Sequence, residues 1–119
     1  MAKFFGKILI TAIAAIIASN LIPGVSIDNS ITAILLAVVL ALLNNFVKPL
    51  LVILTIPITI LTLGLFLIVI NVLIIMWASD IVPGFKVDGW WHAFLFSLLL
   101  SITTALIESL IGKSEDEVK

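Results

Sequence analysis

Two aspartates in similar loop segments are the side chains whose spacing first suggests chemistry. Asp28 and Asp88 lie sixty residues apart, and each follows a Pro-Gly pair, Pro23-Gly24 or Pro83-Gly84. Two carboxylates brought together would make a cation site. Alternatively, each aspartate caps the helix that begins after it, because a carboxylate there accepts free amide protons and suits the helix dipole. We favour capping, which needs no ligand, and expect the Pro-Gly pairs to form turns.

Other reactive side chains are scarce. The chain has no cysteine and a single histidine, His92, so a thiolate site or a histidine cluster for a metal cannot form. There is no Gly-rich phosphate loop and no nucleophile with a partner base. We therefore predict a protein that is not an enzyme, with no catalytic residue, no cofactor, no metal and no identifiable small-molecule substrate.

The composition indicates that lipid is the main solvent. Of the 119 residues, 63% are hydrophobic and 11% are charged, whereas soluble domains are about 45–50% apolar and about 25% charged. So few polar groups cannot cover the surface of a short soluble domain. The net charge of −1, with six lysines and no arginine, also gives no basic stripe for nucleic acid.

Four apolar stretches are long enough to cross a bilayer, which takes about 20 residues. They cover residues 4–22, 30–47, 58–79 and 90–111, and a charged tail follows at 112–119, where we expect a solvated, frayed end. Pro57 makes a straight helix from Leu50 to Ser79 unfavourable, so we expect a bend near it. The predicted fold is an all-α integral membrane protein of four helices in a single domain.

The chain contains an internal repeat. Residues 18–28 align without a gap with residues 78–88, and the register continues into the following helices. The halves, about residues 4–51 and 64–111, are thus two tandem helical hairpins. Because each half has two spans, the halves enter the membrane in the same direction, and we expect a parallel repeat about an axis along the membrane normal.

The lysines predict the orientation. Lys3, Lys7, Lys48, Lys113 and Lys119 fall on one side of the predicted spans and Lys86 on the other. By the positive-inside rule both termini are cytoplasmic and the protein is a multi-pass protein of the cytoplasmic membrane. The two Pro-Gly loops then face outward, with Trp77, Trp90 and Trp91 at the outer boundary, where an indole suits the headgroup region.

Small residues recur every four positions on three of the spans and predict close helix packing. The predicted seams are Thr11, Ala15 and Ser19 in the first span, Ala33, Ala37 and Ala41 in the second, and Ala93, Ser97, Ser101, Ala105 and Ser109 in the fourth. We favour contacts within one chain over contacts between chains, although a homo-oligomer remains an alternative.

A few polar side chains lie inside the predicted spans, where they are costly and so candidates for function. For Asn71 we favour an interhelical hydrogen bond over a transport role. Thr55, Thr59 and Thr62 share one helical face and are expected to bond back to carbonyls near Pro57. Glu108 has two interpretations, pairing with Lys48 at the same depth or, as we favour, reaching water at the headgroups.

Several segments of the chain resemble a known family. They are Asn45-Phe-Val-Lys-Pro-Leu-Leu, the run from Leu54 to Phe66 containing Thr-Ile-Pro-Ile-Thr, Val69-Ile-Asn, and Val82-Pro-Gly-Phe-Lys-Val-Asp-Gly-Trp-Trp. Together they resemble phage holin superfamily four, the small four-span membrane proteins that include the YvlD-like bacterial proteins. The resemblance implies a bacterial cytoplasmic-membrane protein named for the holins that form membrane lesions, and it supplies no binding residues.

Three functions compete at this point. One is a holin-like pore, which requires several protomers because four short helices cannot enclose a sizeable channel. The second is a structural or regulatory envelope protein that acts through membrane partners and conducts nothing. The third, a small multidrug-type exporter, is the least favoured, because that class uses a glutamate in its first helix and this chain has no charge between Lys7 and Asp28.

Overall fold

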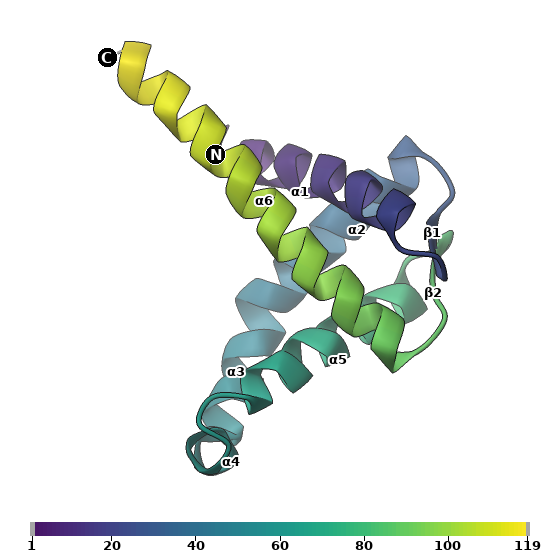
Figure 1. Cartoon of the computed structure of the whole chain (residues 1–119), viewed down its shortest axis with the longest axis vertical. Helices are drawn as coiled ribbons and strands as arrows, with labels where there is room; N and C mark the ends of the chain where they lie inside the picture. The colour runs from purple at the N-terminus through teal and green to yellow at the C-terminus, as the bar shows by residue number, and fades with distance from the viewer. Residues whose placement is uncertain (1, 119) are drawn as a thin grey trace.

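The structure is a computed structural model that describes residues 2–118, with side chains described for residues 3–111. The elements in chain order are α1 (Ala2–Leu21), β1 (Val25–Ile27), α2 (Ser30–Leu42), the π-helical η1 (Leu43–Val47), α3 (Lys48–Leu54), α4 (Ile56–Leu61), α5 (Phe66–Ile81), β2 (Phe85–Val87) and α6 (Trp90–Val118). Helices dominate, which confirms the predicted all-α, four-helix membrane protein (Figure 1).

Three helical stretches are long and apolar enough to cross a membrane, namely Lys3–Leu21, Ser30–Leu54 and Trp90–Ile111. The fourth apolar helix, α5, is shorter. Its 16 residues, at about 1.5 Å each, span about 24 Å, whereas the hydrocarbon core is about 30 Å thick. The neighbouring turn must therefore add to its reach.

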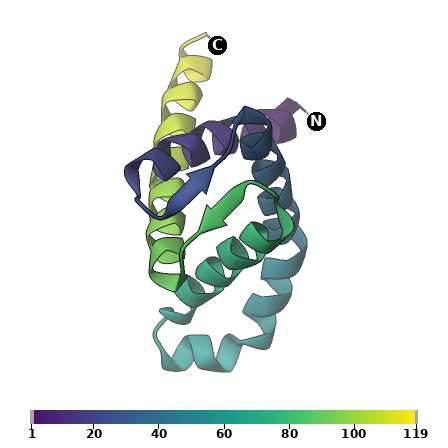
Figure 2. The ribbon, with the colours of Figure 1, turned by 90° about the vertical axis from the view of Figure 1, so that its right-hand side faces the viewer.

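The two Pro-Gly loops meet in a short antiparallel ribbon (Figure 2). Val25 pairs with Val87, Ser26 with Lys86 and Ile27 with Phe85. Because Ser26 and Lys86 are repeat equivalents sixty residues apart, each strand pairs with its own copy about a local pseudo-twofold axis. The alternating apolar and polar residues predicted these extended segments, but not their pairing.

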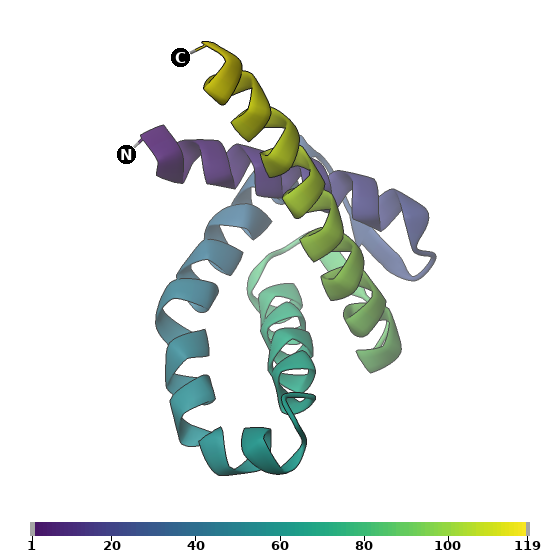
Figure 3. The same cartoon turned by 60° about the vertical axis from the view of Figure 1, so that its left-hand side comes forward.

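The same symmetry extends to single hydrogen bonds at the loops. The Asp28 amide donates to the Gly84 carbonyl at 3.0 Å, and the Asp88 amide donates to the Gly24 carbonyl at 2.9 Å. Each half of the repeat thus closes the loop of the other. The hairpins are locked together at the ribbon end of the molecule, whereas both termini lie at the other end (Figures 1 and 3).

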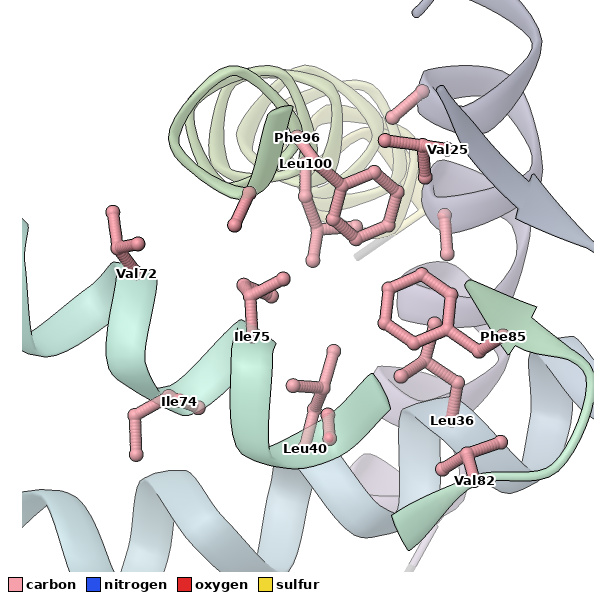
Figure 4. Close-up of a cluster of buried hydrophobic side chains, with 14 of the residues drawn as sticks. Val25, Leu36, Leu40, Val72, Ile74, Ile75, Val82, Phe85, Phe96 and Leu100 are labelled. Carbon is pink, nitrogen blue, oxygen red and sulfur yellow. The ribbon is translucent and has the colours of Figure 1, made fainter. Parts of the chain in front are cut away.

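The core lies directly beneath the ribbon (Figure 4). Phe85 of β2 and Phe96 of α6 are fully buried, with ring centroids 5.3 Å apart. Leu36 of α2 and Val82, at the end of α5, are buried beside them. Side chains from both halves therefore fill the space between the helices at this end.

The path between the second and third spans differs from the prediction. The second helix does not end before Pro49 but continues through η1 and α3 to Leu54. The Lys48 amide donates to the Leu43 carbonyl, five residues back. This π-turn directly precedes Pro49, whose ring would clash with the carbonyl four residues earlier in a regular α-helix.

The expected break near Pro57 is present (Figure 3). The helix stops at Thr55, α4 begins at Ile56, and a turn over residues 62–65 reverses the chain. In that turn Leu63 and Gly64 both have positive φ, and Leu63 is 93% exposed. The third apolar helix therefore starts at Phe66 rather than at residue 58.

The last helix is longer than expected. The charged tail predicted at residues 112–119 is helical as far as Val118, while its side chains lie outside the described residues. Three consecutive acidic residues do not prevent this continuation in the backbone.

Candidate functional site

The predicted loop aspartates lie against the opposite loops. An added Cβ at Gly84 would stand 2.9 Å from Asp28 Oδ2 and 3.0 Å from Thr32 Oγ1, so these side chains cover the glycine closely. At Gly24 the covering groups are the His92 ring and the Asp88 carboxylate. The carboxylates thus belong to two reciprocal loop contacts, and the described residues contain no group of three that could hold a metal ion.

Helix capping falls to a different residue in the first half. Asn29, directly after Asp28, is the N-cap of α2, and its side chain accepts from the Thr32 amide at 2.9 Å. The predicted cap at Asp28 is therefore wrong. In the second half Gly89 occupies the position before Trp90, and its carbonyl accepts from the Ala93 amide at 2.9 Å.

The small-residue seams divide into a buried part and an exposed part. Ala33 and Ala37 of α2 are buried in one cluster with Ile8 and Ala12 of α1. Ala15 and Ala93 are likewise buried, Thr11, Ser19, Ala41 and Ser97 are half-buried, and Ser101, Ala105 and Ser109 are exposed. The buried small residues therefore pack helices against one another within the chain. The exposed small residues of α6, Ser101, Ala105 and Ser109, are not covered by another described helix.

A pocket of about 380 Å3 opens between α1, α2, η1 and α6, at the end of the molecule away from the ribbon. We call it the large pocket. Its apolar lining includes Phe4, Ile8, Leu40 and Leu100. Its polar lining consists of Lys7, Thr11, Asn44, Asn45, Ser101, Thr104 and Glu108.

An ion pair crosses the large pocket. Lys7 Nζ of α1 donates to Glu108 Oε1 of α6, with the side chains 56% and 40% exposed. The prediction that Glu108 pairs with Lys48 is wrong, and Glu108 is not simply solvated either. Because both side chains remain partly exposed, the pair stabilises the fold by at most about 1 kcal/mol.

A second pocket of about 120 Å3, the small pocket, lies between α2, η1, α3, α5 and α6. Its polar lining is Asn44, Lys48, Asn71, Ser97 and Ser101. Asn71 was expected to make an interhelical hydrogen bond, but no such bond joins it to another described residue. Asn71 instead lines this pocket together with Lys48.

The two pockets are copies related by the sixty-residue repeat. Seven of the nine residues that line the small pocket have repeat equivalents in the lining of the large pocket. Thr11 corresponds to Asn71 and Glu108 to Lys48. The polar sites therefore share one architecture but differ in charge, since the large pocket holds a neutral pair and the small pocket a cation.

The three threonines near Pro57 behave differently from one another. Thr55 Oγ1 donates to the Leu51 carbonyl at 2.7 Å, and Thr62 Oγ1 donates to the Ile58 carbonyl at 3.0 Å, as predicted. Thr59 Oγ1 is buried and has no hydrogen-bond partner among the described residues. Two of the three thus satisfy helix carbonyls and line neither pocket.

Sequence reasoning missed Asn44, which lines both pockets, and Lys7 and Thr104 in the large one. The repeat carried a signal for Asn44, because it aligns this residue with Thr104 in the fourth span. The π-turn that carries Asn44 and Asn45 was not predicted, because Pro49 was interpreted as the end of the second span.

Comparisons with known proteins give a consistent result. A family model described as mycobacterial 4 TMS phage holin, superfamily IV, matches residues 2–106. The uncharacterized membrane protein YvlD of Bacillus subtilis is 38% identical over 109 residues, covering 91% of this chain and 92% of the relative. The uncharacterized protein SCO3922 of Streptomyces coelicolor is 36% identical over 114 residues, covering 87% and 91%. No solved structure matches.

The family model covers most of the chain, including nearly all of both halves of the repeat, the whole lining of the small pocket and every residue that lines the large pocket except Glu108. The resemblance seen in the sequence motifs is confirmed. The chain belongs to the four-span phage holin superfamily IV and is a small membrane protein of holin type.

Proposed function

We propose that this protein is a non-enzymatic, multi-pass protein of the bacterial cytoplasmic membrane that assembles with copies of itself into a membrane lesion. Both termini and the two pockets lie on the cytoplasmic side in this arrangement, and the ribbon lies outside. The distribution of the lysines supports it. So do Trp90 and Trp91, which are exposed at the start of α6 beside the ribbon, where indoles suit the outer headgroups.

The apolar turn after α3 fits a membrane location. No charged residue lies between Lys48 and Asp80, and Leu61 and Leu63 are among the most exposed side chains. Such a segment is unfavourable in water. We place α4 and its turn in the cytoplasmic edge of the hydrocarbon, where they compensate for the short α5.

One observation carries the proposed activity, namely that the wall of the large pocket is also an uncovered edge of α6. Ser101 and Ala105 line the pocket and are exposed. Ser109 extends the same face of the helix by one turn. Small residues at such an edge let a second copy approach closely, and polar pocket walls from several copies can together surround water.

A single protomer does not provide a path across the membrane. Neither pocket is lined by Leu36, Phe85 or Phe96, which are buried under the ribbon. The lesion therefore needs an assembly of protomers, with the polar walls turned toward one another. The exposed edge of α6 is the contact in this proposal.

Controlled expression in a bacterium while membrane potential is recorded with a dye tests the proposal. Wild type should depolarise the membrane at modest expression. Ser101→Leu and Ala105→Leu should abolish depolarisation without loss of protein from the membrane, because a larger side chain separates the protomers. Leu106→Phe, an enlargement on a neighbouring face of α6, serves as the control and should behave like wild type.

The buried seam is a poor place for this test. Ala37 is 1% exposed, so Ala37→Leu would overpack the protomer itself and confuse misfolding with lost assembly. An intact membrane potential at high expression of the wild type would contradict the proposal. It would favour an envelope protein that acts through membrane partners and conducts nothing.

A further inference from the structure

The small pocket contains a cation, Lys48, for which the described side chains supply no counter-ion. The ammonium group of Lys48 makes no ion pair or hydrogen bond with another described residue, whereas that of Lys7, the lysine of the other pocket, is paired with Glu108. Lys48 is half-buried between helices. Because an uncompensated charge in such a place is costly, an external partner would stabilise it.

The remaining lining suits an anion. Asn44, Asn71, Ser97 and Ser101 bring amide and hydroxyl donors to the pocket, and no carboxylate lines it. These residues belong to η1, α5 and α6, so three elements besides α3, which begins at Lys48, contribute polar groups to the lining. The volume of about 120 Å3 admits a group of a few heavy atoms.

The local backbone supports a specialised site. The π-turn over Leu43–Val47 contains Asn44 and directly precedes Lys48, whereas the repeat-equivalent residues 103–107 of α6 are regular α-helix. Pro49 explains why the turn can form here, since Ser109 occupies the equivalent position in the other half. As a result of this π-turn, Asn44 and Lys48, which lie on adjacent helical turns, both line the small pocket.

We propose that the small pocket binds a phosphate group whose negative charge is not balanced by a cation in the same molecule. Lys48 supplies the positive charge, and Asn44 and Asn71 act as positioning donors. The pocket lies at the end of the molecule that the lysines place on the cytoplasmic side, at the depth of the headgroups. Lysine is a common phosphate ligand, and anionic headgroups attract such side chains there. The phosphate can come from an anionic phospholipid or from free phosphate in the cytoplasm.

Native mass spectrometry of the full-length protein tests this binding. The protein is released from bilayers that contain phosphatidylglycerol and phosphatidylcholine with identical acyl chains. Wild type should retain one phosphatidylglycerol in preference to phosphatidylcholine. Lys48→Gln should weaken this retention by about tenfold or more, since hydrogen bonds to charged groups contribute that much.

Two further variants separate the site from general charge and from folding. Lys3→Gln removes the same charge from an exposed lysine that lines neither pocket, and it should retain the lipid like wild type. Asn71→Asp keeps Lys48 and nearly the same side-chain shape but supplies an internal counter-ion. It should abolish the preference even if Lys48→Gln fails to fold.

Inorganic phosphate distinguishes the two sources. If millimolar phosphate binds in bilayers of phosphatidylcholine alone, and Lys48→Gln removes this binding, the ligand is free phosphate. If phosphate does not bind but phosphatidylglycerol is retained, the ligand is the lipid headgroup. Equal losses in Lys48→Gln and Lys3→Gln, or no discrimination between the lipids with no binding of phosphate, would overturn the proposal. The readout is binding, so it does not depend on lesion formation.

Discussion

The reciprocal loop contacts make a quantitative prediction at Gly24. Gly24 has φ +94°, and a Cβ added there would stand 2.6 Å from His92 Cδ2 and 2.8 Å from Nε2. Gly24→Ala therefore adds two costs, the left-handed backbone and a clash with a half-buried ring. The backbone cost is about 1–2 kcal/mol, and overpacking adds about 1–3 kcal/mol.

Gly64 provides the matched control. Its φ is +89°, but a Cβ added there has no heavy atom within 4 Å among the residues compared. Gly64→Ala should thus lower the free energy of unfolding by the backbone cost alone, about 1–2 kcal/mol. The difference between the two variants isolates the contact of one loop with the histidine of the other half.

The assay is unfolding of the purified protein in mixed micelles by titration with a denaturing detergent, followed by tryptophan fluorescence. All three tryptophans lie within residues 77–91, close to the ribbon. His92→Ala made together with Gly24→Ala should recover the overpacking share, which a double-mutant cycle measures. Equal destabilisation in Gly24→Ala and Gly64→Ala, or a cycle with no coupling, would refute the reciprocal contact.

Three further predictions concern other parts of the fold. Phe96→Ala should lower the free energy of unfolding by about 3 kcal/mol in the same assay, because the ring is fully buried against the aromatic ring of β2. Lys7→Gln and Glu108→Gln should each cost at most about 1 kcal/mol, and the double variant no more than the larger single effect, since the pair is half-exposed. In the double variant Ser26→Cys, Lys86→Cys of this cysteine-free protein, a short thiol crosslinker should join the two cysteines within one chain. The crosslinked chain should migrate faster on a denaturing gel. A crosslinked band only at the size of a dimer would contradict the ribbon.

The repeat allowed much of the architecture to be predicted from the residues. Apolar run lengths predicted helices near residues 4–22 and 90–111; α1 ends one residue short of the first range, and α6 covers the second. The sixty-residue offset predicted equivalent loops, and both loops contain an extended segment between Pro-Gly and aspartate. These features follow from local composition and from self-similarity, which a single sequence displays.

The remaining features depend on contacts that no local pattern shows. Pairing of β1 with β2 joins residues sixty apart, and the repeat showed only that the strands are alike. Proline normally ends a helix, so continuation past Pro49 required knowledge of the π-turn before it. Leu63 at φ +57° could not be expected, because leucine has no intrinsic preference for that region.

The ion pair between Lys7 and Glu108 shows why equal depth in the membrane was insufficient to predict the partner of Glu108. The repeat places Glu108 and Lys48 at equivalent positions, and this equivalence suggested a contact between them. Equivalent residues face equivalent pockets, however, so the symmetry assigns them to different pockets. Glu108 meets Lys7 of α1 in its own pocket, whereas the repeat equivalent of Lys7 is the uncharged Leu67, so Lys48 has no ionic partner at the matching position among the described residues.

The two halves share one architecture, but their pockets differ in charge. The loops at the ribbon are matched in the two halves, as their equivalent hydrogen bonds of 3.0 and 2.9 Å show. The pockets at the other end differ at the two positions that carry charge. The two halves are thus alike at the ribbon end and differ in charge at the pocket end. A lipid phosphate at Lys48 would restore neutrality to the second pocket, so that both pockets carry a balanced pair at the same depth.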